Sequence, residues 1–263
     1  MARRMSPKRR VLNCEPSKGV ESDWGLQHAT EAGLVDAAPR LPTSKDLRES
    51  WWAVGDQGET GSCVGWASTD SVLRWHFVKA GPLGKSELLS PRFEWMASKE
   101  TDPDQSRPTT FIEREGTTLK AALDIARKFG TVRDSVLPFA SGKLFPGDAK
   151  TFYAIAAQLR ISMYFNLGTD AGKWRTWLAT SGPILTRLDV DATWDGAEQT
   201  KGKLDTYQPG TTRGGHAVAF VGYTSHRFIV RNSWGPTWGD KGFGYASLDY
   251  AAAAFTEAYG VVL

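Results

Sequence analysis

The sequence predicts an α+β fold with two lobes, a helical lobe at about residues 48–160 and a lobe of antiparallel strands at about 161–263. Two observations carry this prediction. Apolar residues recur at helical spacing up to about residue 160, and short β-rich runs joined by short links follow from there. A chain of 263 residues, 41% of them hydrophobic and 23% charged, is long enough and apolar enough to bury such cores.

Residues 1–40 are interpreted as an arm ahead of the main domain, because they are polar and show no sustained periodicity. Five lysines and arginines lie in the first ten residues, and subtracting their +5 from the net charge of +3 leaves −2 for the rest. We therefore expect no nucleic-acid partner. The arm is either flexible or draped over the body, or it is a short autoinhibitory segment, and its composition fits both interpretations.

Neither a secretory signal peptide nor a membrane span is expected. The basic residues 1–12 lack the apolar core of a signal peptide, and no apolar run approaches 18 residues. The two cysteines, Cys14 and Cys63, offer no disulfide framework, which favours a reducing compartment or a fold that needs no cross-links. We expect a cytoplasmic protein without a membrane partner, and delivery by a route that needs no signal peptide stays open.

Four helices are predicted in the first lobe, at 63–80, after Ser90-Pro91, at 118–129 and at 148–159. The first ends at Gly81-Pro82, and Ser90 with Pro91 is typical of a helix start. On the first helix His76 lies about 220° around the axis from Cys63, so we interpret it as structural.

Short apolar runs predict the strands of the second lobe, with a helix among them at 170–179; the strands are 160–167, 184–190, 217–223, 228–232 and 242–247. The stretch from Trp194 to Arg213 is rich in Gly and Lys, has no period and is interpreted as a loop. Asp191, at the end of a strand, is interpreted as a solvated turn residue. Short links between strands favour antiparallel pairing.

Cys63 stands where a glycine-rich segment gives way to a sequence that can form a helix. A thiol is nucleophilic as thiolate, and the first turn of a helix lowers a thiol pKa because free N–H groups and the positive dipole end lie there. Six residues earlier, Gln57 can turn back through Gly58 and Gly61 and form an oxyanion hole with the backbone N–H of Cys63. The alternative is a buried structural cysteine behind a glycine loop.

Two distant segments favour the catalytic interpretation. His216 opens a β-rich run, and Asn232 begins an Asn-Ser-Trp-Gly motif sixteen residues later. With Gln57 and Cys63 in this order, the chain resembles the papain-like cysteine peptidases of family C1. It resembles a bacterial-type variant without the usual disulfides, because Thr60 stands where the family usually has a second cysteine.

The resemblance implies a helical lobe that carries the cysteine, a barrel-like antiparallel lobe that carries the histidine, and an active-site cleft between them. It places the peptidase domain at 41–263, because Leu41 to Arg48 resembles the segment that begins the mature enzymes. It also implies that His216 takes the proton of Cys63 to give a thiolate–imidazolium pair, and that Asn232 orients the imidazole.

Substrate-binding residues follow from the same resemblance. Glu115-Gly116-Thr117 falls where the family has an edge that pairs with an extended peptide, and Gly116 leaves room for a substrate backbone. Glu115 either narrows the cleft and favours a basic substrate side chain, or points to water. Two further residues are predicted at the substrate cleft. Gly215 lies beside the histidine in the sequence, and Trp234 is expected to shield the imidazole–amide hydrogen bond from water.

We expect no cofactor and no metal, because no His, Cys or acidic cluster has metal-ligand spacing and no phosphate-binding glycine motif is present. The predicted partner is a protein or peptide substrate. Three functions stay open: a thiol peptidase, a transpeptidase or peptide ligase that passes the acyl group to an amine, and a binding module with a silent site. Competent residues at the Gln, Cys, His and Asn positions argue against the silent site.

Overall fold

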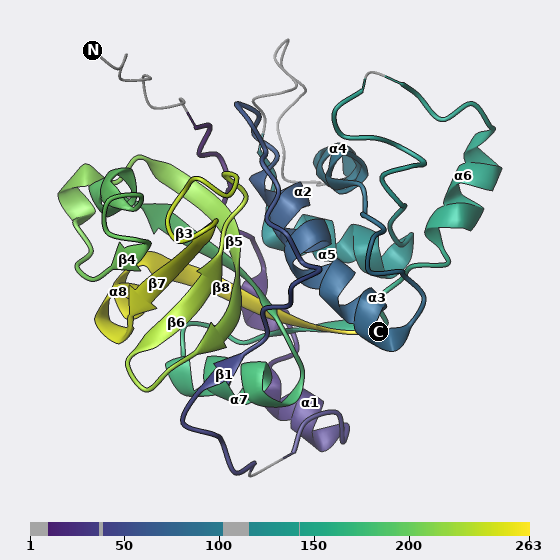
Figure 1. Cartoon of the computed structure of the whole chain (residues 1–263). Coiled ribbons are helices and arrows are strands. Elements are labelled where there is room, and N and C mark those ends of the chain that lie inside the picture. Colours follow the sequence, from purple (N-terminus) through teal and green to yellow (C-terminus); the bar gives the residue numbers. More distant parts are fainter. Residues whose placement is uncertain (1–9, 37–38, 102–115, 142) are drawn as a thin grey trace, which may run out of the picture.

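The computed structural model describes residues 10–36, 39–101, 116–141 and 143–263 (Figure 1). The helices between residues 63 and 156 gather on one side of the molecule and the strands on the other, with the remaining helices beside the strands, which agrees with the α+β prediction. Glu115, one of the predicted substrate-binding residues, lies outside the described residues.

The four helices predicted in the first lobe are confirmed. α2 (Cys63–Ser68), a π-helical turn (Thr69–Leu73) and α3 (Arg74–Ala80) form one continuous helical segment, and α4 (Pro91–Thr101), α5 (Leu119–Lys128) and α6 (Ala149–Ala156) follow. Their ends agree with local capping signals: Ser90 Oγ accepts from the N–H of Phe93 at 3.1 Å, and Gly81 stops α3 at a φ of 100°.

The second lobe is built on an eight-stranded sheet in which β2-β8-β3-β5-β6-β7-β4 are neighbours in this order and β1 also pairs with β5. The strands are β1 (Lys45–Asp46), β2 (Met163–Asn166), β3 (Ile184–Val190), β4 (Lys203–Leu204), β5 (Gly214–Tyr223), β6 (Arg227–Arg231), β7 (Phe243–Ser247) and β8 (Phe255–Val262). β4 and β7 pair in parallel, and the other strand pairs are antiparallel. The five predicted strands and the helix α7 (Ala171–Thr180) are confirmed.

Three strands and two helices were not predicted. They are β1, β4 and β8, with α1 (Leu26–Glu31) in the arm and α8 (Leu248–Ala254) before β8. β8 matters most for the fold, because it lies between β2 and β3 in the sheet and pairs with both. Its partners lie about 70 to 100 residues earlier, which no local pattern reveals.

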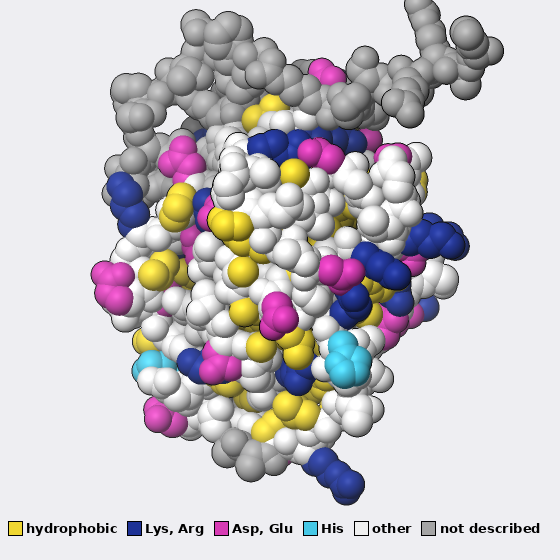
Figure 2. Space-filling model, turned by 90° about the vertical axis from the view of Figure 1, so that its left-hand side faces the viewer, with side chains coloured by type: hydrophobic (Ala, Val, Ile, Leu, Met, Phe, Trp, Pro, Cys, Tyr) yellow, Lys and Arg dark blue, Asp and Glu magenta, His cyan; other side chains and the backbone are white. Residues whose placement is uncertain are grey.

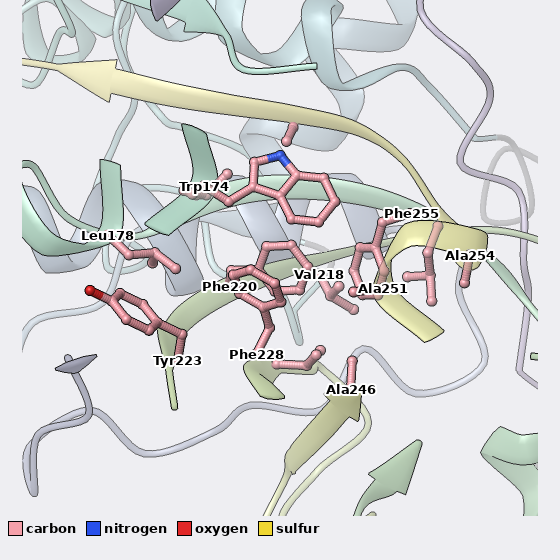
Figure 3. Close-up of a cluster of buried hydrophobic side chains, with 14 of the residues drawn as sticks. Trp174, Leu178, Val218, Phe220, Tyr223, Phe228, Ala246, Ala251, Ala254 and Phe255 are labelled. Atoms are coloured by element: carbon pink, nitrogen blue, oxygen red, sulfur yellow. The ribbon is translucent and has the colours of Figure 1, made fainter. Parts of the chain in front are cut away.

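The strand that carries His216 packs against both cores of the protein. Ala217, Ala219 and Val221 of β5 join the core shared with α2, α3 and α5. Val218 and Phe220, which alternate with them, join the core beneath α7 and α8. In that second core, shown in Figure 3, the Phe220 ring lies 4.5 Å from Phe255 and 4.8 Å from Phe228, centre to centre. β5 is therefore held rigidly on both faces, and so is the backbone that presents the histidine.

The outer face of the strand lobe shows acidic and basic side chains interspersed, with apolar side chains in small groups between them (Figure 2). No single sign of charge dominates this face. Among the helices in the described ranges, none has the length and apolarity to cross a bilayer.

His76 makes the stability of the fold depend on pH. It is 8% exposed, its Nε2 has no hydrogen-bond partner among the described residues, and burial lowers its pKa to about 4. The unfolded chain, with a His pKa of about 6.5, binds the proton first, so stability is full above that value and falls as pH drops towards 4. We expect the free energy of unfolding to fall by up to about 1.4 kcal/mol per pH unit more in wild type than in His76→Gln between about pH 6 and pH 4.5.

Urea unfolding midpoints of the two proteins across this range provide the measurement. Equal pH slopes in wild type and His76→Gln would contradict the assignment.

Candidate active site

Cys63 is the first residue of α2, and Gln57 lies in the turn that precedes it. The N–H of Gln57 donates to the carbonyl of Ser233 at 2.8 Å, and its Oε1 accepts from Ser233 Oγ at 2.7 Å. Its Nε2 donates to the carbonyl of Thr60 at 3.0 Å, which leaves the second N–H of the amide for another acceptor. Gly58 permits this turn, because its φ of 64° is one that side chains disfavour. The motif thus holds an amide donor at the start of the helix that carries the thiol.

His216 and Asn232 come from neighbouring strands. His216 is the third residue of β5, and Asn232 follows the last residue of β6. The His216 Nε2 and the Asn232 Oδ1 lie 2.8 Å apart, and this oxygen also accepts from the N–H of Ser233 at 2.8 Å. Because Oδ1 only accepts, Nε2 carries the proton. Nδ1 has no oxygen or nitrogen partner among the described residues, and it is the ring atom left to face the Cys63 thiol.

The surroundings of Cys63 favour its thiolate. The pKa of the thiol lies well below its ordinary value, first because of the neighbouring Cys14 thiol. The His216 imidazole and the backbone at Ala217 act in the same direction, whereas burial opposes them. The pKa of Cys14 is raised, by burial first and then by the neighbouring Cys63 sulfur. Of the two thiols, Cys63 is the one that ionises.

Three tryptophans surround the imidazole. Trp234 lies 4.9 Å from the His216 ring, Trp194 meets the ring edge-to-face at 5.7 Å, and Trp238 stacks on Trp194 at 4.7 Å. All three indoles are at most 6% exposed, so they exclude water from one side of the ring. The structure thus places the predicted Trp234 against His216 and adds Trp194, which the sequence did not indicate.

Two interpretations from the sequence are wrong here. Trp194 lies in a 3₁₀ helix (Ala192–Gly196) and is buried, although the surrounding stretch was interpreted as a loop. Asp191 is fully buried instead of solvated, and accepts a hydrogen bond from the hydroxyl of Tyr250 at 2.6 Å. That hydroxyl accepts from the Trp194 Nε1 at 2.9 Å. The signal in the sequence that could have indicated this burial is Trp194 itself, a single large apolar residue in a polar stretch.

The arm enters the site between the lobes (Figure 1) and is anchored there by Arg10. Its guanidinium donates to the Asp56 carboxylate at 2.7 Å and to the carbonyls of Gly58 at 2.8 Å and Trp234 at 2.9 Å. The arginine side chain is 14% exposed. Arg10 therefore joins the arm to the turn before Cys63 and to the segment after Asn232.

The arm backbone pairs with both walls of the site. The N–H of Cys14 donates to the carbonyl of Gly215 at 3.0 Å, and the N–H of Glu15 donates to the carbonyl of Thr117 at 3.2 Å. A Cβ on Gly215 would collide with the Cys14 carbonyl, and a Cβ on Gly116 would collide with the Asn13 carbonyl. Gly116, Thr117 and Gly215, predicted to bind substrate backbone, thus hold the backbone of the arm. The described part of the arm is thus draped over the body and across this site.

No group of three His, Cys, Asp or Glu residues in the described part of the chain could hold a metal ion. Both cysteines are free thiols.

Comparison with known proteins identifies the fold and the family. The sequence profile of papain family cysteine proteases matches residues 41–257. The chain is 29% identical to cathepsin B-like CP3 of Giardia intestinalis over 231 residues, which cover 82% of this chain and 72% of that protein. It is 24% identical to Peptidase 1 of Dermatophagoides farinae over 250 residues, which cover 90% and 70%.

Solved structures share the fold. The structure of xylellain, a cysteine protease from Xylella fastidiosa, superposes with a TM-score of 0.75 at 20% identity and covers 98% of this chain and 99% of that one. Procathepsin L2 of Tenebrio molitor gives a TM-score of 0.67 at 21% identity, with 97% and 78% covered. With the family profile spanning most of the sequence, the chain belongs to the papain family of cysteine proteases.

Proposed function

We propose that this cysteine peptidase hydrolyses peptide bonds with Cys63 as nucleophile, His216 as acid and base, and Asn232 as the orienting group. The observation that carries the proposal is the position of the His216 ring, which is hydrogen-bonded to Asn232 through Nε2 and faces the Cys63 thiol with its other edge. This is the arrangement that a thiol, a base and a third group need for acyl transfer.

The steps follow from the protonation states. The Cys63 proton passes to Nδ1 of His216, because the surroundings lower the thiol pKa and Nε2 is already protonated towards Asn232. The sulfur attacks the substrate carbonyl, and the N–H of Cys63 and the free amide N–H of Gln57 stabilise the oxyanion. Nδ1 then protonates the leaving amine, and the neutral imidazole takes a proton from the water that attacks the thioester and releases the Cys63 sulfur.

Arrival of a substrate requires the arm to leave. The arm backbone uses the carbonyls of Gly215 and Thr117 that an extended peptide would use, so the described state is a closed one. We propose that substrate and arm compete for this cleft, and that Gly116, Thr117 and Gly215 form its peptide-binding edge. Trp234 closes the same cleft beside His216.

The test is the mass of the products formed from a synthetic peptide, with and without an added amine such as glycinamide. We expect fragments that have together gained one water, with little fragment joined to the amine. Mainly amine-joined product would show a transpeptidase or ligase. An intact peptide, together with failure of an epoxide probe to label Cys63, would show a silent site.

A further inference from the structure

The arm brings the second cysteine of the chain to the nucleophile. Cys14 is 2% exposed and Cys63 is fully buried, both belong to the same apolar cluster, and each thiol lies near enough to shift the pKa of the other. The chain has two cysteines, so each is the other's single protein thiol. Sites 49 positions apart in sequence meet because the arm crosses the cleft.

The backbone of the arm holds Cys14 in this place on both sides. Its N–H donates to the carbonyl of Gly215 at 3.0 Å, and its carbonyl accepts from Nε of Arg187 at 3.0 Å. Further along, the N–H of Ser17 donates to Oε1 of Glu257 at 2.8 Å. The carbonyl of Cys14 is thus bound to a guanidinium on the sheet, whereas its sulfur meets Cys63. The group of Cys14 that lies near the nucleophile is therefore its thiol. The peptide carbonyl of Cys14 is held by Arg187 instead.

We propose that Cys14 and Cys63 form an oxidative modification site, at which a small disulfide converts the two thiols into a disulfide that locks the arm in the cleft and withholds the nucleophile. The proposal rests on the proposed function for one point, the role of Cys63 as nucleophile. Formation of the Cys14–Cys63 disulfide does not depend on that role and requires the two thiols to lie close together.

The reaction balances with a small disulfide as oxidant. The Cys63 thiolate attacks one sulfur of the small disulfide and expels a thiolate, which leaves a mixed disulfide on Cys63. The Cys14 sulfur, once deprotonated, attacks the Cys63 sulfur and expels the second small thiolate. Two protein thiols lose two electrons in all, their two protons pass to the two released thiolates, and one small disulfide is reduced to two thiols.

The acidities of the two thiols suit these roles. Cys14 is the first cause of the lowered pKa of Cys63, but His216 and the backbone at Ala217 also lower it and stay in place when the arm is displaced, so Cys63 is the thiolate that reacts first with an external oxidant. Cys14, with its raised pKa, stays protonated and unreactive until a mixed disulfide forms beside it. Because Cys63 is covered while the arm is in place, the external oxidant reaches it when the arm is displaced, and return of the arm then delivers the second thiol.

The experiment treats the full-length, reduced protein with oxidised glutathione and measures intact mass, disulfide-linked peptides and peptidase activity. For wild type we expect loss of two hydrogens in mass, a Cys14–Cys63 linked peptide, loss of activity, and recovery with dithiothreitol. For Cys14→Ser we expect the reaction to stop at a glutathione adduct on Cys63, with activity before oxidation at least that of wild type. A persistent glutathione adduct on wild type, without the linked peptide, would overturn the proposal.

Arg10→Ala tests whether the folded arm, rather than chance collision, brings the thiols together. This variant loses hydrogen bonds to three oxygens, and we expect its equilibrium constant for disulfide formation against glutathione to fall at least about tenfold. Arg48→Ala is the matched control, since Arg48 bonds to Asp46 and Tyr245 away from the arm and its loss should leave the constant unchanged. Equal constants in wild type and Arg10→Ala would refute a latch held by the arm.

The mass measurements separate this proposal from the proposed function. If the linked peptide forms but the reduced protein cleaves no peptide, the modification site stands and the proposed function fails. If the reduced protein cleaves peptides but only adducts form on oxidation, the proposed function stands and the modification site fails.

Discussion

Replacing Cys63 by serine is expected to lower kcat/KM for a fluorogenic peptide by about 10⁴-fold or more. The pKa of Cys63 is lowered first by Cys14 and then by His216 and the backbone at Ala217, and the last two stay in place when the arm leaves for substrate, so the sulfur still ionises. A serine hydroxyl titrates far above any thiol, so the same imidazole cannot hold it as the anion, and the nucleophile is lost. The measurement is kcat/KM under reducing conditions, with active sites counted by an epoxide probe.

Two further variants complete this test. His216→Ala should lose activity to a similar extent, and combining it with Cys63→Ser should cost little more, because residues that act as one unit are strongly non-additive. Cys14→Ser is the matched control, since it changes the other buried cysteine of the same cleft and should retain at least wild-type activity. Activity of Cys63→Ser within tenfold of wild type would refute the assignment of the nucleophile.

Asp70→Asn is expected to lower the free energy of unfolding by about 3–5 kcal/mol, the largest stability effect that the structure suggests. Asp70 lies in the π-helical turn of the first lobe and binds two guanidinium groups, Arg74 at 3.1 Å and the fully buried Arg231 at 2.5 Å. Burial lowers the pKa of Arg231, and Asp70 counters that effect. Without the carboxylate, two cations stay buried with no countercharge.

This ion pair also connects the lobes next to the site. Arg231 is the last residue of β6 and precedes Asn232, and its guanidinium donates to the carbonyls of Trp52 at 2.9 Å and Ala53 at 2.8 Å. The measurement is urea-induced unfolding followed by fluorescence and circular dichroism. The control is Asp195→Asn, which breaks the exposed pair with Arg213 and should cost no more than about 1 kcal/mol. Similar small losses in both variants would show that the buried pair is not what stabilises the junction.

Helices and strands with local signals could be predicted well from the sequence. α3 ends at Gly81 and α4 begins after Ser90, as expected, because a glycine stop and a serine cap act on the backbone beside them. β3 was predicted with its observed bounds, since apolar and β-branched residues recur through this segment and Gly182-Pro183 precedes it. β8 was not predicted, because its first residues follow a run of alanines and its stability comes from pairing with β2 and β3.

The chemical roles in the site could be predicted from the sequence, whereas the positions of the residues were decided by the tertiary structure. A thiol at a helix start, a glutamine six residues before it, a histidine and an amide follow from residue identity and order, because those groups have fixed chemical capacities. That Trp194 lies against the imidazole, that Asp191 is buried and bonded to Tyr250, and that Cys14 lies near Cys63 was decided by packing between segments far apart in the chain. Such contacts depend on which surfaces fit together once the elements have formed, and the order of residues along one segment carries no record of its distant neighbours.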